Sequence, residues 1–274
     1  MARPDLSYLK NLLLFLLGMP LGMSTGLSGA AASNFAIPAT RSLLGLQITR
    51  AVGTGLAVTL FTALASLLSY SQHDFLRGRL AVALLVGLSV GKAMGQRIIP
   101  ATKRRWLWGI PLAVLGLAMI AEALGYFTWP RGYRLVNTLG VHDLRFVLIA
   151  ILLAFGIGII SQIIGLGSEL IVPAQIYLLG LTPHVAIGTA LVVLALASLP
   201  GLLVLARHGQ IDLQSAAWLS FGGIFGGLIG AFWAVHLPDQ ILLALFGALL
   251  TLLGIRLLWV REDSAPAPIN RAED

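Results

Sequence analysis

The feature of this sequence that most limits its fold is a series of long, mostly apolar blocks. Examples are Leu80–Ile99, Trp106–Phe127, Phe146–Ile164 and Ile241–Val260. Each has about 20 residues, the length that an α-helix needs to cross the ~30 Å hydrocarbon core of a bilayer. Charged residues make up only 11% of the chain, whereas a soluble domain carries roughly 25%. The chain is therefore predicted to be an all-α polytopic membrane protein.

The charge pattern and the residue types exclude several classes of function. The net charge is +7, but the basic residues stand between the apolar blocks, where the positive-inside rule places them, and form no stripe for nucleic acid. The absence of cysteine excludes disulfides, thiolate metal sites and cysteine nucleophiles. The histidines do not cluster with carboxylates at metal-ligand spacing, and paired intramembrane carboxylates are missing. We therefore expect no metal, no cofactor and no enzymatic activity.

An internal repeat with a shift of 135 residues organises the chain. Pro38 aligns with Pro173 and, without a gap, Gly53-Thr54 aligns with Gly188-Thr189. The same register pairs Ser33 with Ser168, Gly45 with Gly180, His73 with His208, and Gly87, Gly91 and Gly95 with Gly222, Gly226 and Gly230. Leucine-rich helices match by chance, but these positions are not leucines and they share one register. Internal repeats of this kind are typical of secondary transporters.

Each half is predicted to contain about five helical segments. A first helix, Leu9–Leu27 or Phe146–Ile164, precedes a short segment, Phe35–Leu46 or Leu170–Leu181, and three fuller helices follow. The fuller helices are predicted at 50–70, 80–99 and 106–127, and at 185–206, 213–235 and 241–260. The predicted divisions are a first repeat at 1–127, a loop at 128–145, a second repeat at 146–261 and a disordered tail at 262–274.

An odd number of crossings per half would invert the second half relative to the first. The charges favour this arrangement with both termini cytoplasmic. The inner side would then hold Arg3, Lys10, Arg41, Arg50, Arg97, Lys103, Arg104, Arg105, Arg207, Arg256 and Arg261, and the outer side Arg77, Arg79, Arg131, Arg134 and Arg145. Re-entrant short segments would instead place the cluster 103–105 outside. Whether the short segments cross or re-enter stays open at this level.

The small-residue breaks before the short segments are the first candidate binding site. The stretches 28–34 and 165–169 each precede a short helix with Pro38 or Pro173 near its start, and Ser33 and Ser168 are predicted N-caps. A helix that begins at membrane depth points free N–H groups and the positive end of its dipole into the protein, an arrangement that binds anions. The alternative is that these glycines merely allow close helix packing.

Two charged residues inside apolar segments are further candidates. Lys92 lies within the segment 80–99, where it could bind an anion, pair with Glu169 or extend to the interface. Glu169, whose counterpart is Asn34, could couple transport to protons, or it could be a solvated carboxylate at a helix N-terminus. The candidate substrate-binding residues are Ser33, Asn34, Thr54, Lys92, Gln162, Gly167, Ser168, Gln175 and Thr189. The glycine ladders are interpreted as packing surfaces that would also permit a homodimer.

At these motifs the chain resembles the sulfite exporter TauE/SafE family, also called the toluene sulfonate uptake permeases. The resemblance rests on the stretches 165–173 (GLGSELIVP), 180–189 (GLTPHVAIGT) and 208–212 (HGQID), and on the glycine-rich stretch 221–230. It is good over about 156–258 and looser in the first half. Family members often carry three glycines before the proline, whereas this chain has Gly-Ser-Glu and Ala-Ala-Ala-Ser-Asn.

The resemblance implies a bacterial inner-membrane permease that moves sulfite, sulfoacetate or related organosulfonates, usually outward. The leading prediction is a secondary carrier in which two inverted halves rock around a midplane anion site, driven by protons or by the membrane potential. The alternatives are an anion channel, an uptake permease for another small organic anion, a membrane-embedded enzyme and a non-transporting subunit. The buried charges at positions 92 and 169 argue against the last.

Overall fold

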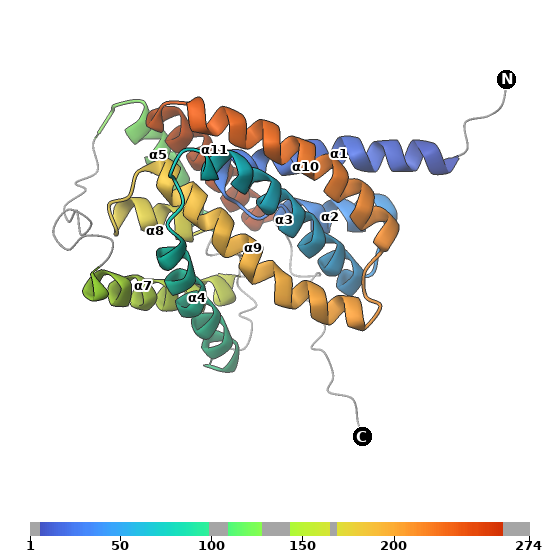
Figure 1. The fold of residues 1–274 in the computed structure, drawn as a ribbon, viewed down its shortest axis with the longest axis horizontal. Coiled ribbons are helices and arrows are strands. Elements are labelled where there is room, and N and C mark those ends of the chain that lie inside the picture. Colours follow the sequence, from blue (N-terminus) through green and yellow to red (C-terminus); the bar gives the residue numbers. More distant parts are fainter. Residues whose placement is uncertain (1–5, 99–108, 128–142, 165–168, 260–274) are drawn as a thin grey trace.

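The computed structural model describes residues 6–98, 109–127, 143–164 and 169–259 of the chain. These residues form ten helices and no strand (Figure 1). Seven of the helices are long and apolar enough to span a membrane. The prediction of an all-α polytopic membrane protein is therefore confirmed, whereas the predicted tail, the basic cluster 103–105 and most of the loop 128–145 lie outside the described residues.

The helices of the first half are α1 (Leu6–Ser28), α2 (Ser33–Leu44), α3 (Ile48–Ser71), α4 (Gly78–Ile98) and α5 (Gly109–Ala123). Those of the second half are α7 (Leu144–Ile164), α8 (Ile171–Tyr177), α9 (Pro183–Arg207), α10 (Leu213–His236) and α11 (Asp239–Trp259). The starts of α3 and α9, and those of α4 and α10, differ by the repeat shift of 135 residues. The helix α8 is shorter than predicted, because it ends at Tyr177 and a turn with Gly180 at φ 72° follows.

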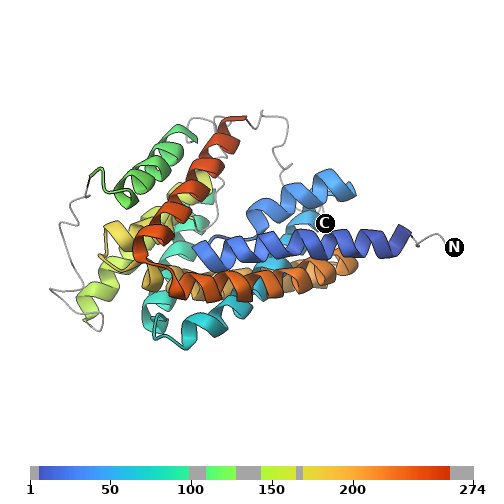
Figure 2. The same ribbon diagram turned by 90° about the horizontal axis from the view of Figure 1, so that it is seen from above.

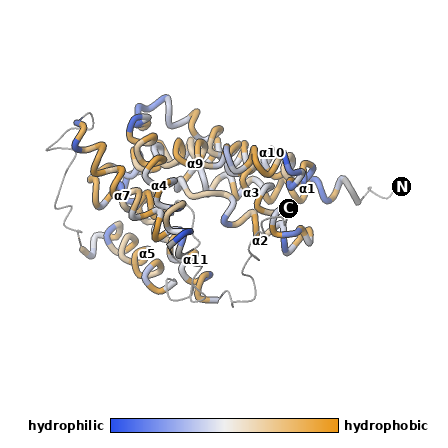
Figure 3. The backbone as a smooth tube through the Cα atoms, turned by 90° about the horizontal axis from the view of Figure 1, so that it is seen from below, coloured by the Kyte–Doolittle hydropathy of each residue, from blue (hydrophilic) through white to orange (hydrophobic). Residues whose placement is uncertain are grey.

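Large apolar side chains cover the outside of the described helices. Leu152, Leu68 and Val114 are 69%, 61% and 57% exposed, and the tube in Figure 3 is predominantly hydrophobic along most helices. A surface of this kind would aggregate in water, but it matches the hydrocarbon core of a bilayer. The lipid therefore replaces water as the surrounding solvent, as the composition predicts.

Glycines bring the first helix of each half against the fourth helix of the other half. In the contact of α1 with α10, a Cβ added at Gly22 would lie 2.0 Å from the Gly223 carbonyl oxygen, and one at Gly226 would lie 1.9 Å from that of Met19. The contact of α4 with α7 is built in the same way, since a Cβ at Gly91 would lie 2.1 Å from the Phe155 carbonyl oxygen. Both glycine ladders are thus packing surfaces, and Figure 2 shows α1 beside α10 and α5 beside α11.

The order of these contacts fixes the relative directions of the helices. The residues of α1 and α10 increase together along their contact, and α3 also runs parallel to α10, with Val58 and Thr62 near Gly223 and Thr62 and Ser66 near Gly227. The helices α1 and α3 therefore point the same way, although only α2 separates them in the chain. The segment that contains α2 must carry the chain back.

The directions of the paired helices in the two halves also follow. In the contact of α3 with α9, Gly53 lies against Gln210 and Gly188 lies against Tyr70, so these two equivalent helices are antiparallel. The helices α5 and α11 are antiparallel as well, since Gly109 meets Gly254 and Gly116 meets Gly247. Two inverted repeats would have these directions, and the inverted-repeat interpretation itself stays a prediction. The orientation of the bundle in a membrane stays a prediction.

Candidate functional site

The two repeat-equivalent residues Asn34 and Glu169 meet each other in the structure. The side-chain amide of Asn34 donates a hydrogen bond through Nδ2 to Oε1 of Glu169. The Glu169 side chain is fully buried, and its Oε2 has no hydrogen-bond partner among the described residues. A buried carboxylate oxygen without a donor is costly. This contact between the halves is therefore a candidate site for a proton or a ligand.

A break in the helix places Asn34 halfway along the bundle. The helix α1 ends at Ser28, Gly29 adopts φ 67°, and α2 begins at Ser33. The backbone N–H of Ser33 donates to Oγ1 of Thr59 at 2.9 Å, near the middle of α3. The start of α2 thus lies at the middle of a spanning helix, as the prediction of a broken helix requires.

The predicted N-cap role of Ser33 is wrong. Ala32 occupies the cap position of α2 and no side chain caps that helix end, because Ser33 is already helical. The hydroxyl of Thr59, on the neighbouring helix, accepts the free N–H in place of a cap. In the second half, Ser168 and Gly167 lie outside the described residues.

The position of Pro38 also differs from the prediction. Pro173 lies in the first turn of α8 as expected, but Pro38 lies in the second turn of α2. Proline has no N–H, so the carbonyl of Asn34, four residues earlier, loses its intrahelical donor. That oxygen accepts a hydrogen bond from Nη1 of Arg256 at 2.6 Å instead. Because α2 begins a turn before Pro38, the Asn34 carbonyl obtains its donor from another helix instead of from α2.

Arg256 is a site residue that the sequence reasoning missed. The charge pattern places it only among the basic residues of the inner side, although it lies within the apolar block 241–260. A single arginine in such a block is the signal that could have identified it. Its side chain is half-buried and reaches from the last turn of α11 to the start of α2.

Thr54 and Thr189 are fully buried, and neither hydroxyl has a hydrogen-bond partner among the described residues. They occupy equivalent positions in the antiparallel helices α3 and α9. Thr54 therefore lies towards the Gln210 end of this pair, and Thr189 towards the Tyr70 end. The structure does not bring the two threonines to one level, because each stands on its own side of the middle of the bundle.

The remaining described candidates lie on α8, α4 and α7. Gln175 is buried and donates through Nε2 to the Ala186 carbonyl at 3.3 Å, while its Oε1 has no partner among the described residues. Lys92 is half-buried in α4 and interacts electrostatically with Glu169, although the two form no direct ion pair. Gln162 is half-buried in α7 and packs beside Gly95 of α4.

Buried side-chain oxygens without a partner are thus concentrated in the candidate residues. In the part of the chain that the structure describes, Thr54, Glu169, Gln175 and Thr189 carry four of the six such atoms. Most buried polar groups in proteins are hydrogen-bonded. Hydroxyl, amide, ammonium and guanidinium donors can bind the oxygens of a small anion, and a carboxylate can take up a proton.

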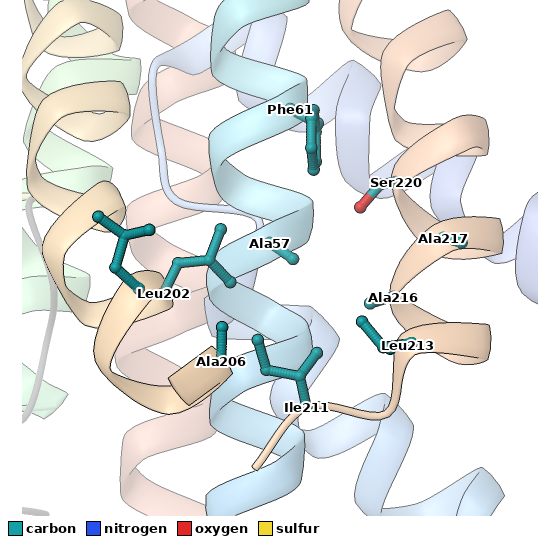
Figure 4. A pocket seen from close by; sticks show the side chains of 10 residues that line it. Ala57, Phe61, Leu202, Ala206, Ile211, Leu213, Ala216, Ala217 and Ser220 are labelled. Atoms are coloured by element: carbon teal, nitrogen blue, oxygen red, sulfur yellow. The ribbon is translucent and has the colours of Figure 1, made fainter. Parts of the chain in front are cut away.

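An open groove between α3, α9 and α10 is lined almost entirely by apolar side chains, unlike the polar candidate site (Figure 4). It has a volume of about 340 Å³ and is lined by Ala57, Phe61, Leu202, Leu203, Ala206, Ile211, Leu213, Ala216, Ala217 and Ser220. Ser220 contributes the single polar side chain of this lining, and Phe61 and Leu203 are 44% and 50% exposed on the apolar outer surface. Apart from the Ser220 hydroxyl, a small anion would find no side-chain donor there to replace its hydration.

Comparison with known proteins identifies membrane transporters. A "Probable membrane transporter protein" of Xylella fastidiosa strain Temecula1 is 28% identical over 246 residues, which cover 87% of this chain and 91% of the relative. The "Probable membrane transporter protein YunE" of Bacillus subtilis is 23% identical over 220 residues, which cover 76% of this chain and 80% of the relative. No solved structure matches the chain.

The family assignment rests on nearly the whole sequence. The sequence model described as "Sulfite exporter TauE/SafE" matches residues 2–122 and 138–273. These matches include both helix breaks, both glycine ladders and the residues around the Asn34–Glu169 contact. The chain is a multi-pass membrane transporter, and it belongs to the sulfite exporter TauE/SafE family.

Proposed function

We propose that this transporter is a secondary carrier that exports a small sulfur-containing anion, such as sulfite, sulfoacetate or another organosulfonate. The resemblance of its motifs and the description of its family support this substrate class. The observation that carries the proposal is the set of buried side-chain oxygens without a partner among the described residues, which includes Oε2 of Glu169 at the Asn34–Glu169 contact and the hydroxyls of Thr54 and Thr189. Together with Lys92, these groups offer donors for an oxyanion and one acceptor for a proton.

The proposed mechanism is alternating access. The anion binds near the Asn34–Glu169 contact, where the two halves meet at the middle of α3. Thr54 stands on one side of this level and Thr189 on the other. When one half rocks against the other, the site would open first towards the side on which one of these threonines lies and then towards the side of the other.

Glu169 is proposed to couple the transport to protons. Its Oε2 has no donor among the described residues, so a proton on this oxygen would neutralise a buried carboxylate that is only partly hydrogen-bonded. An incoming anion would be repelled by the carboxylate and not by the carboxylic acid. Binding of the anion and of the proton would therefore favour each other.

We place the carrier in the inner membrane of a bacterium, with both termini in the cytoplasm. The relatives described above are bacterial. The basic residues of the helix ends follow the positive-inside rule in this orientation.

The proposal is tested by uptake of labelled sulfite and sulfoacetate into proteoliposomes, with and without a pH gradient and with unlabelled anion preloaded. A carrier shows saturable flux that accelerates after preloading, and proton coupling makes this flux respond to the pH gradient. Flux without saturation or acceleration would identify an anion channel instead. Folded protein that moves neither anion would refute the proposed substrate class.

A further inference from the structure

Arg256 is a cation in a membrane-spanning helix, and no carboxylate neutralises it among the described residues. It lies in the candidate span Asp239–Trp259 and is half-buried. An arginine near a helix end commonly extends to the lipid–water interface. Here the guanidinium donates to the Asn34 carbonyl at 2.6 Å, directly beside the Glu169 contact. Its charge is thus directed to the site.

The hydrogen bond to the Asn34 carbonyl fixes the position of the Arg256 guanidinium and occupies only some of its N–H groups. The carbonyl is available because Pro38 cannot donate to it. It is neutral, so it does not compensate the positive charge. A guanidinium has five N–H groups in a planar fork, and the contact with Asn34 involves Nη1 alone.

The two cations of the site come from different halves. Lys92, in α4 of the first half, interacts with Glu169 of the second half. Arg256, in α11 of the second half, contacts Asn34 of the first half. Among the described residues, Lys92, Arg256 and Glu169 together carry a net positive charge even when Glu169 is ionised.

We propose that Arg256 is a second anion-binding residue, which donates its remaining N–H groups to the oxygens of the transported anion. The inference rests on the proposed function and deepens it. A planar fork of donors suits the adjacent oxygens of a sulfite or sulfonate group. The bound anion would then be held between Lys92 of one half and Arg256 of the other, so that neither half alone forms the site.

The test compares Arg256→Lys, Arg256→Gln and Arg256→Ala with wild type. The readouts are the KM and kcat of sulfite uptake in proteoliposomes and the rise in Tm that sulfite causes in detergent. Gln keeps an amide that can donate to the Asn34 carbonyl but lacks the charge. We expect Gln and Ala to raise KM by about tenfold or more with a smaller change in kcat, and Lys to have an intermediate KM. The Gln and Ala variants should also need about tenfold more sulfite for the same rise in Tm.

The Pro38→Ala background separates anion binding from a purely structural role. This substitution restores a backbone N–H at position 38, which can donate to the Asn34 carbonyl and so replace the contact of Arg256 with α2. We expect KM to stay raised in Pro38→Ala/Arg256→Ala relative to Pro38→Ala alone. A wild-type KM in Arg256→Gln and Arg256→Ala, or a restored KM in the double variant, would overturn the inference and leave the proposed function intact. Wild-type protein that neither moves nor is stabilised by sulfite or sulfoacetate would refute both.

Discussion

At the scale of single residues, the threonines of α3 fall into two kinds. The hydroxyl of Thr59 accepts the N–H of Ser33 at 2.9 Å and thereby replaces a helix cap. The hydroxyl of Thr54, almost one and a half turns away, is equally buried but has no partner among the described residues. The first hydroxyl stabilises the break, whereas the second is available to a ligand.

Valine substitutions should therefore separate stability from binding. We expect Thr59→Val to lower the stability by about 1–3 kcal/mol, since a buried N–H loses its acceptor. Thr54→Val and Thr189→Val should leave the stability nearly unchanged but raise the KM for the anion by roughly tenfold, as a hydrogen bond to a charged group is worth about 1.5–3 kcal/mol. Tm values in detergent and KM values from proteoliposome uptake give the two readouts. Unchanged KM in both Thr54→Val and Thr189→Val would remove these hydroxyls from the site.

Glu169→Gln tests proton coupling with little change of shape. Gln can still accept a hydrogen bond from Asn34 through its side-chain oxygen, but it does not titrate. We expect uptake to continue with a KM equal to or below that of wild type, because a negative charge is removed from the site, and to lose its response to a pH gradient. Glu122→Gln is the matched control, since Glu122 accepts from Tyr177 Oη at 2.7 Å and is not one of the proposed site residues. A response to the pH gradient that persists in Glu169→Gln would exclude Glu169 as the coupling group.

The sequence predicted the site only partly, for a physical reason. The repeat register singles out Asn34 and Glu169 at the helix breaks, and Thr54 and Thr189 within α3 and α9, because equivalent positions in the two halves are expected to face the same interior. It could not reveal the contact of Arg256 with Asn34. That contact depends on α2 starting a turn before Pro38, which in turn depends on Thr59 accepting the N–H of Ser33. The start of α2 is thus determined by a tertiary contact, which cannot be predicted from local residue preferences.

At the scale of helices, the prediction from sequence was strongest where an element is long and apolar. The spanning helices α3, α9 and α10 start within two residues of their predicted positions. The short helix α8 was predicted too long, because its apolar pattern continues to Leu181 while the backbone turns at Gly180. Length and hydropathy define a membrane span, but they do not define where a short buried helix stops.

The glycine contacts between α1 and α10 should tolerate no added methyl group. We expect Gly22→Ala and Gly226→Ala to lower the stability by about 1–3 kcal/mol or more, because each Cβ would overlap a backbone atom of the facing helix. Gly156→Ala in α7 is the matched control, since its Cβ would meet no atom within 4 Å. That variant should be neutral or slightly stabilised through helix propensity. Thermal unfolding in detergent measures all three, and equal Tm values for Gly22→Ala and Gly156→Ala would contradict the packing.

At the scale of the whole molecule, the helix directions decide how the short segments lie. The helices α1, α3 and α10 are mutually parallel, so the chain returns between α1 and α3. This result could not be read from the sequence, in which a dozen apolar residues fit a crossing and a re-entrant loop equally well. The charge pattern favoured the crossing, and the directions of the packed helices agree with it.

Labelling from the two sides of the membrane tests this topology. The chain has no cysteine, so Gln72→Cys, just after α3, and Leu213→Cys, at the start of α10, each introduce a single thiol at an exposed position. Because α3 and α10 are parallel, these two positions lie on opposite faces. We expect an impermeant maleimide to label Gln72→Cys in intact cells and Leu213→Cys only in opened membranes. Labelling of both from the same side would contradict the parallel arrangement.

The meeting of Asn34 with Glu169 also has a consequence for ancestry. If the two halves descend from one short protein that worked as an antiparallel dimer, the residue at this position met its own copy. Two amides can bond to each other, but two carboxylates at such a distance cannot both be ionised. After duplication and fusion, each copy could change alone, and an amide could come to face a carboxylate. On this account, a single titratable group at the centre became possible only once the two halves were encoded in one chain.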